Sequence, residues 1–225
     1  MLQSGARRVI LLELSRSVDG VIRENLENSQ FDNWDTVHCS IDAPPLREQS
    51  IELVMCHNVI QHTPSVEQTA RALFRLVAPG GEFVFNCYPK NDDGLIRWLR
   101  LNAVYRPLRL ALSNCPFQVN LSYATSMGLL RLIPGLGILL EKAGFCSQGE
   151  VLNPDGSPPS LRRRFEATRL NTFDRFGSHT FQHLMSDADL RRLLAQLQPE
   201  TSKIGNLDLY FSRPAPIGCA LRVKR

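Results

Sequence analysis

Three histidines are the side chains of this sequence best suited to moving protons. His62, His179 and His183 have imidazole rings that titrate near neutral pH, so each is a candidate general base. His179 and His183 are four residues apart, a spacing that can hold a metal ion on a helix. Both precede Ser186, which has the sequence of a helix cap, so we place them in a loop. With no third ligand evident nearby, we expect no metal site.

Two acids follow predicted strands. The apolar run at 9–12 is typical of a strand buried on both faces, and Glu13 ends it. At the carboxyl end of such a strand, an acid can accept hydrogen bonds from both ribose hydroxyls of a nucleotide. Asp42 comes just after a second predicted strand, at 37–40. A solvated surface acid is the alternative for Glu13, and an Asp-Ala-Pro-Pro turn is the alternative for Asp42.

Strand-like and helix-like segments alternate from residue 9 to residue 87. The predicted strands are 9–12, 37–40, 51–56 and 82–87, and the predicted helices follow Ser15 and cover 66–77. Ala78-Pro79-Gly80-Gly81 stops the second helix. This alternation predicts an α/β fold with a parallel, doubly wound sheet.

The rest of the chain is organised differently. From 90 to 180 we expect a mostly helical insertion, and its segment 95–105 is apolar on nearly all sides, which favours a buried helix. A helix capped by Ser186 and two antiparallel strands, the first at 207–211 and the second at 217–223, follow. We therefore divide the chain into a partial nucleotide-binding core at 1–89, a cap at 90–180 and a segment at 181–225 that completes the core.

Composition and charge limit the classes of function. With 43% hydrophobic and 21% charged residues, the chain must bury a core rather than remain disordered. Between 94 and 140 there are five arginines and no acid, which suits an apolar or anionic substrate, or a weak contact of 95–140 with a membrane surface. We favour a buried cap with arginines at its rim. Interleaved aromatic residues are lacking, so we expect no nucleic-acid partner.

The cysteines and the first residues point to a cytoplasmic protein. None of the six cysteines lies within three residues of another, so no Cys-x-x-Cys redox or zinc pair occurs. Unpaired cysteines suit a reducing compartment. The first apolar run has only four residues, fewer than a secretory signal needs.

Four ordered segments resemble class I S-adenosylmethionine-dependent methyltransferases that act on small molecules. These segments are 7–15, 38–54, 56–85 and, more weakly, 178–224. Glu13-Leu14-Ser15 matches the acid, apolar residue and serine that end the family's second strand. The segments at 59–62 and 75–85 match two further motifs, with Val77 and Ala78 in place of the usual Leu-Lys. The resemblance implies a Rossmann-like fold of the methyltransferase type and S-adenosylmethionine as the cofactor.

The resemblance also implies roles for particular residues. The cofactor contacts would come from Glu13, Leu14, Ile41, Asp42, Ala43, Cys56 and His57. His62 would line the pocket of the transferred methyl group. His179 and His183 lie in a stretch that resembles a substrate-facing segment of some of these enzymes.

One part of the family pattern is not found. The first strand and the glycine-rich turn that cradles the methionyl group should precede Glu13 by about 20 residues. In the family's sheet that strand lies between those expected here at 9–13 and 51–56, so the sheet is expected to be incomplete at its N-terminal side. We expect that the protein begins upstream and that the sequence is a fragment or has a misplaced start.

Methyl transfer to a small molecule, apolar or lipid-like, is therefore the function that the sequence favours. Two alternatives remain open: a catalytically inactive remnant that serves as an interaction module, and a nicotinamide-binding oxidoreductase, which also carries an acid after its second strand. The acceptor atom and the oligomeric state are left open.

Overall fold

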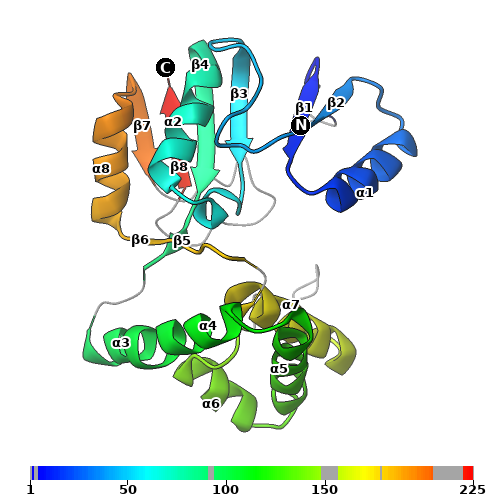
Figure 1. Cartoon of the computed structure of the whole chain (residues 1–225), viewed down its shortest axis with the longest axis vertical. Helices are drawn as coiled ribbons and strands as arrows, with labels where there is room; N and C mark the ends of the chain where they lie inside the picture. Colours follow the sequence, from blue (N-terminus) through cyan, green and yellow to red (C-terminus); the bar gives the residue numbers. More distant parts are fainter. Residues whose placement is uncertain are drawn as a thin grey trace. The chain divides into compact units, whose positions relative to one another are not determined.

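The structure is a computed structural model, and it describes residues 2, 5–90, 94–147, 157–177, 179–204 and 220–224. The chain forms two compact units. The first unit comprises Met1–Pro89 with His183–Arg225, and the second comprises Lys90–Gln182. All strands of the described residues belong to the first unit, whereas the second is built from helices (Figure 1).

The first unit has an α/β architecture. Its elements are β1 (Val9–Glu13), α1 (Arg16–Glu27), β2 (Trp34–His38), β3 (Ile51–Cys56), a 3-10 turn (Ile60–His62), α2 (Val66–Leu76), β4 (Val77–Asn86), β5 (Tyr88–Pro89), β6 (Leu184–Met185), α8 (Asp187–Leu197), β7 (Thr201–Ile204) and β8 (Ala220–Lys224). Serine caps begin all three helices: Ser15, Ser65 and Ser186 each accept a hydrogen bond from a backbone amide of the first turn. The predicted caps at Ser15 and Ser186 are thus confirmed.

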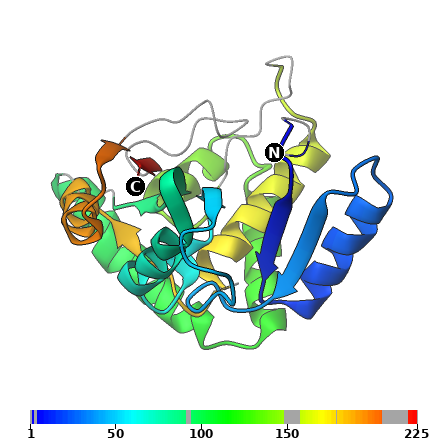
Figure 2. The same cartoon turned by 90° about the horizontal axis from the view of Figure 1, so that it is seen from above.

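The strands lie in separate sheets. β1 pairs with β2 in parallel, and α1 lies alongside this pair (Figure 2). A second sheet has the order β3-β4-β8-β7, with β3 and β4 parallel and β8 antiparallel to both neighbours. Within the described part of the chain, β1 and β3 do not pair, in agreement with the expected break between these strands. An exposed ion pair joins Arg7, just before β1, to Glu52 of β3, at 3.0 Å.

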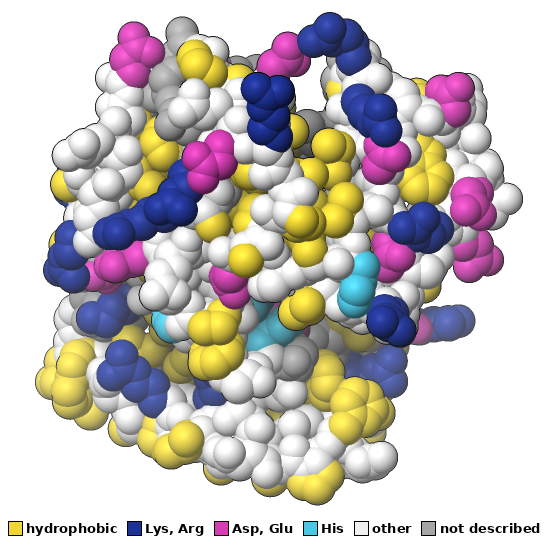
Figure 3. Space-filling model, turned by 45° about the horizontal axis from the view of Figure 1, so that its top comes forward, with side chains coloured by type: hydrophobic (Ala, Val, Ile, Leu, Met, Phe, Trp, Pro, Cys, Tyr) yellow, Lys and Arg dark blue, Asp and Glu magenta, His cyan; other side chains and the backbone are white. Residues whose placement is uncertain are grey.

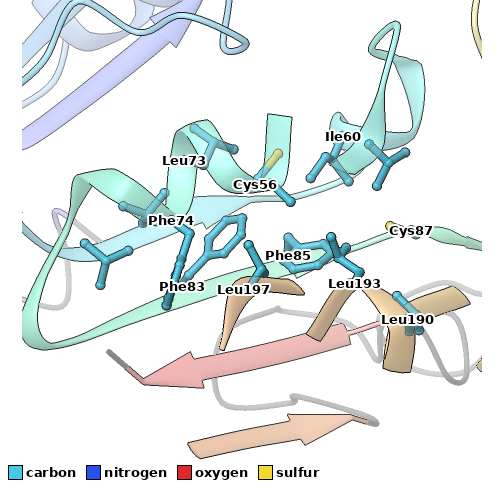
Figure 4. Close-up of a cluster of buried hydrophobic side chains, with 14 of the residues drawn as sticks. Cys56, Ile60, Leu73, Phe74, Phe83, Phe85, Cys87, Leu190, Leu193 and Leu197 are labelled. Carbon is cyan, nitrogen blue, oxygen red and sulfur yellow. The ribbon is translucent and has the colours of Figure 1, made fainter. Parts of the chain in front are cut away.

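The hydrophobic core lies between β3, β4 and two helices. α2 and α8 cover the same face of the sheet, since they contact each other and Arg71 of α2 donates a hydrogen bond to Gln196 of α8. Figure 4 shows Phe83 and Phe85 of β4 beside side chains of both helices. The two phenyl rings are fully buried and stack with centroids 4.8 Å apart. Because these strands are buried, their carboxyl ends are held in fixed positions.

Two predicted strands begin earlier in the structure than the sequence indicated. β2 begins at Trp34 rather than at residue 37, and β4 begins at Val77 rather than at residue 82. Val77 ends α2 and already pairs with Ile51, so the turn that was expected to separate helix and strand lies inside β4. β8 overlaps the last predicted strand and pairs antiparallel with β7, a strand at 201–204 that the sequence pattern did not predict. The strand predicted at 207–211 lies outside the described residues.

Gly81 is required by the close approach of β4 to β3. A Cβ atom at Gly81 would lie 2.8 Å from the backbone oxygen of Glu52 and 2.9 Å from that of Ala78. We expect Gly81→Ala to lower the free energy of unfolding by about 1–3 kcal/mol, because backbone atoms must move to make room. Gly20, in the middle of α1, has no neighbour within 4 Å of such an atom. Gly20→Ala should raise stability by about 0.5–1 kcal/mol. Urea unfolding of both variants tests the contrast, which equal effects would contradict.

The second unit is helical. Its elements are α3 (Leu95–Leu99), a π-helical turn (Arg100–Tyr105), α4 (Arg106–Ser113), α5 (Phe117–Leu130), α6 (Leu136–Ala143) and α7 (Leu161–Phe176). α3, the π-helical turn and α4 follow one another without interruption, and Pro107 is the second residue of α4. None of the helices in the described residues combines the length and apolar character that a membrane crossing requires.

The expectation of a buried helix at 95–105 is wrong for its first half. Leu95 and Ile96 are 72% and 82% exposed, and Trp98 is 50% exposed. Only Leu101 and Tyr105 of this segment are buried. An all-round apolar sequence shows that a helix can be buried on any side, but the neighbours of this helix cover one side alone.

Candidate functional site

Glu13 lies at the carboxyl end of β1, where the sequence placed it. Its side chain is half-buried, and its Oε1 accepts a hydrogen bond from the backbone N–H of Ser15 at 2.7 Å. A carboxylate has about four acceptor positions. Glu13 can therefore accept hydrogen bonds from a ligand as well. The next residue, Leu14, has 66% of its surface exposed, so its apolar side chain is accessible to a ligand at this strand end.

Asp42 is held in a turn by two hydroxyl groups. Its carboxylate accepts hydrogen bonds from Thr69 of α2 and from Ser40, the latter at 3.3 Å. Thr69 is itself 2.9 Å from the hydroxyl of Thr63. These contacts fix the carboxylate against α2, so Asp42 has a structural role whether or not it also contacts a ligand.

The residues on either side of Asp42 and those after β3 differ in accessibility. Ile41 packs against the core, whereas Ala43 is exposed. Cys56 is buried in the core, and burial raises the pKa of its thiol to about 12. Its side chain is therefore a neutral core residue, and only its backbone can approach a ligand. His57 is exposed, and partial desolvation lowers the pKa of its ring.

An asparagine pair fixes the loop that follows β3. Asn86, fully buried at the end of β4, accepts a hydrogen bond from the backbone N–H of Asn58 at 2.6 Å. Its amide nitrogen donates in return to Oδ1 of Asn58 at 2.5 Å. Asn58 has a positive φ of 55°, a conformation that asparagine tolerates better than most residues. The pair joins the carboxyl ends of β3 and β4 and thereby orients His57.

Two of the three predicted histidines lie against the same turn. His62 ends the 3-10 turn, is half-buried, and packs edge-on against the ring of Tyr88 with centroids 5.5 Å apart. His183 donates its backbone N–H to the carbonyl of Gln61 at 2.9 Å. Its Nε2 lies 2.9 Å from the carbonyl oxygen of Thr63. Because a carbonyl only accepts, Nε2 carries the proton, and Nδ1 is the basic atom of the ring.

Gln61 lies at the centre of this turn with its amide unsatisfied. The side chain is fully buried, and neither Oε1 nor Nε2 has a hydrogen-bond partner among the described residues. A buried polar group without a partner costs about 1–3 kcal/mol. Water or a ligand group that reaches this amide would remove the cost.

His179 belongs to the second unit, whereas His62 and His183 belong to the first. Its Nε2 lies 2.9 Å from Oδ1 of Asp174, near the end of α7. Arg109 of α4 donates hydrogen bonds to the backbone oxygens of Arg175 and His179, at 2.8 and 2.7 Å. The arginine thus fixes the segment that carries both members of the pair. A carboxylate beside an imidazole orients the ring and stabilises its protonated form.

The segment that carries these strand ends matches a known family of domains. Residues 1–85 match the family profile described as "methyltransferase domain". The match covers β1 to β4 with the helices between them. The match supports the resemblance of residues 1–85 to class I methyltransferase domains. No curated protein sequence matches the chain.

Solved structures of methyltransferases are similar to this chain. The CMeT domain of the citrinin polyketide synthase has a TM-score of 0.50 and 9% identity over 99% of this chain and 40% of that chain, so the likeness shows a shared fold. A SAM-dependent methyltransferase of Methanosarcina mazei has a TM-score of 0.48 and 10% identity, over 96% of this chain and 80% of that chain.

A third structure aligns with a smaller part of the chain. The methyltransferase of Haloferax volcanii in complex with the Trm112 activator has a TM-score of 0.35 and 21% identity, over 39% of this chain and 38% of that chain. The chain thus spans about two fifths of the length of this protein and of the CMeT structure.

The methyltransferase domain implies S-adenosylmethionine as its cofactor, and the strand ends fit the nucleoside half of that molecule. Glu13 offers acceptor positions for ribose hydroxyls, and Leu14 offers an accessible apolar surface. For the methionyl half, the described residues provide no glycine-rich turn at the carboxyl end of a strand. Gly80 and Gly81 lie near the opposite end of β4, where Gly81 approaches Glu52.

The sequence did not reveal three features of this domain. The Asn58–Asn86 pair joins residues 28 apart, and the one signal for it is that both asparagines follow or end predicted strands. The buried amide of Gln61 has no sequence signal, since glutamine is usually exposed. In the second unit, Asp174 is five residues from His179, and its role depends on where α7 ends.

Proposed function

We propose that this protein transfers the methyl group of S-adenosylmethionine to a small, apolar acceptor. The observation that carries the proposal is the family match of residues 1–85 together with Glu13 at the carboxyl end of β1. S-adenosylmethionine supplies a methyl group that is electrophilic because it is bonded to a positively charged sulfur. The protein's own contribution is to bind, orient and exclude water.

The binding residues follow from the geometry of the strand ends. Glu13 would accept hydrogen bonds from the ribose, and Leu14 and Ile41 would pack near the nucleoside. Asp42, fixed by Thr69 and Ser40, would accept from the adenine amino group at a remaining acceptor position. His57 and the backbone of Cys56 would line the same edge, held there by the Asn58–Asn86 pair.

A hydroxyl acceptor would need a general base that takes its proton, whereas an amine acceptor depends less on such a base. His179 is the best equipped of the histidines for this role, because the Asp174 carboxylate stabilises the imidazolium that forms. His183, whose basic atom is Nδ1, and His62 are the candidates in the first unit. The exposed apolar side chains of the second unit support the apolar class of acceptor.

Isothermal titration with S-adenosylmethionine tests the proposal. We expect the wild-type chain to bind with a dissociation constant in the micromolar range. Glu13→Gln should lower the affinity about 10- to 100-fold, since two charge-assisted hydrogen bonds become weaker. Glu24→Gln is the matched control, because Glu24 is an exposed acid on the neighbouring helix α1. Its affinity should equal that of the wild type.

Two outcomes would contradict methyl transfer. Binding of NADH but not of S-adenosylmethionine would favour the nicotinamide-dependent alternative. Binding of neither molecule by a folded chain would favour an interaction module without catalytic activity.

A further inference from the structure

The helical segment 95–113 has several large apolar side chains that remain exposed among the described residues. Its buried side consists of Leu101, Tyr105 and Leu112. The exposed side, which we call the α3–α4 face, contains Leu95 (72% exposed), Ile96 (82%), Trp98 (50%), Leu99 (44%) and Leu110 (68%). Four of these five residues lie in the five-residue helix α3. Apolar side chains this accessible, and this close together, indicate an interaction surface.

Exposed arginines lie within the segment that forms the α3–α4 face. Arg97 and Arg106 are exposed, and the sequence has no acid between residues 94 and 140. The guanidinium of Arg106 donates to the side chain of Asn102 at 2.7 Å, an interaction that leaves its charge unneutralised. Arg109 has a different task, since it holds the end of α7. In the view of Figure 3, hydrophobic side chains reach the surface beside lysine and arginine side chains.

We propose that the α3–α4 face docks on an anionic lipid surface. Helices that lie in the membrane interface combine Trp and Leu on one side with Arg or Lys beside them. Arginine stems extend along apolar surface while their charged ends reach phosphate groups. The exposed arginines within this segment complement the phosphate groups of an anionic lipid surface. The proposal does not depend on methyl transfer.

Cosedimentation with vesicles tests the proposal on the full chain. We expect binding to phosphatidylcholine vesicles that contain about 30% phosphatidylglycerol, and much weaker binding to phosphatidylcholine alone. Ile96→Glu should reduce the partition coefficient at least about tenfold, because one buried aliphatic side chain is lost and a negative charge is added. Arg97→Gln with Arg106→Gln should reduce it about 30-fold, and only for the anionic vesicles.

Controls separate docking from loss of structure. Leu170→Glu changes a residue on α7 that is 60% exposed and lies outside the α3–α4 face. It should bind vesicles within about twofold of the wild type. Tryptophan emission should shift to shorter wavelength on anionic vesicles, and Trp98→Phe should abolish the shift. Circular dichroism of each variant should match the wild type.

Three results would overturn the proposal. The first is absence of cosedimentation with anionic vesicles. The second is an equal loss of vesicle binding for Leu170→Glu and Ile96→Glu. The third is a wild-type dimer in sedimentation velocity that Ile96→Glu dissociates, since a second copy would then cover the face.

Discussion

Asn86→Ala should lower the free energy of unfolding by about 3 kcal/mol, a large effect for the removal of a polar side chain. Asn86 is fully buried and makes two hydrogen bonds with Asn58, at 2.6 and 2.5 Å. Alanine removes both bonds. The backbone N–H of Asn58 then loses its partner, and the volume of the amide becomes a void. Chemical denaturation of the two proteins measures the difference.

Asn58→Gly is the matched variant. It keeps the backbone N–H that donates to Asn86 and relaxes the positive φ of 55°, but removes the acceptor of the Asn86 amide. We expect Asn58→Gly to lower the free energy of unfolding by less, about 1 kcal/mol. The double variant should show a coupling energy of at least about 0.5 kcal/mol, since the two residues share their hydrogen bonds. A coupling energy near zero would contradict the pairing.

The same pair gives a prediction about dynamics. The amide proton of Asn58 should exchange slowly with solvent in the wild type and rapidly in Asn86→Ala, because its acceptor is gone. If the amide proton of Asn58 already exchanges rapidly with solvent in the wild type, Asn86 does not fix the loop after β3. The orientation of His57 would then need another explanation.

Local sequence patterns predicted the elements of the first unit well, because their causes are local. The apolar runs of β1 and β3 and the serines that cap α1 and α8 depend on residues within a few positions of one another. The ends of β2 and β4 were missed, since they depend on pairing with another strand. Val77 is drawn into β4 by its pairing with Ile51, 26 residues earlier.

The expected break between β1 and β3 came from the family resemblance rather than from a local pattern. The residues of β1 are largely half-buried, and α1 has no buried residue, although the sequence of β1 is apolar enough for a strand covered on both faces. Sequence therefore predicted the tendency of β1 to be buried. Whether other elements cover β1 depends on the arrangement of the whole sheet.

Burial of the segment 95–105 could not be predicted for the same reason. Hydrophobic residues on all sides of a helix do not say which side meets a neighbour. Tyr105 and Leu101 meet the rest of the second unit, where Tyr105 packs against Phe176 with ring centroids 5.5 Å apart. Leu95 and Ile96 have no such neighbour among the described residues and remain exposed.

The candidate site was predicted only as far as residue types at strand ends allow. Glu13 was predicted because an acid after an apolar run has a clear chemical use. The different situations of the histidines were not visible in sequence: His183 hydrogen-bonds to Thr63 in the first unit, and His179 to Asp174 in the second. Only four residues separate these two histidines, yet the boundary between the units falls between them.

The stability of the protein should fall steeply above pH 9, with Cys56 as a main cause. Burial raises the pKa of its thiol from 9.0 to about 12, so the folded state keeps the thiol proton while the unfolded state loses it. Stability decreases with pH wherever the unfolded state binds fewer protons, which for Cys56 is the range from about pH 9 to about pH 12. The expected loss is about 1 kcal/mol per pH unit in that range.

Urea unfolding at pH 8, 9 and 10, with a reducing agent present, measures this dependence. Cys56→Ala should be less stable at pH 8, because a core side chain is shortened, but its stability should decrease less between pH 9 and pH 10. Burial also raises the pKa of Tyr123 to about 12, so some alkaline loss should remain in this variant, and Tyr123→Phe with Cys56→Ala should reduce it further. Equal slopes for the wild type and Cys56→Ala would show that the Cys56 thiol ionises as readily in the folded protein as in the unfolded chain.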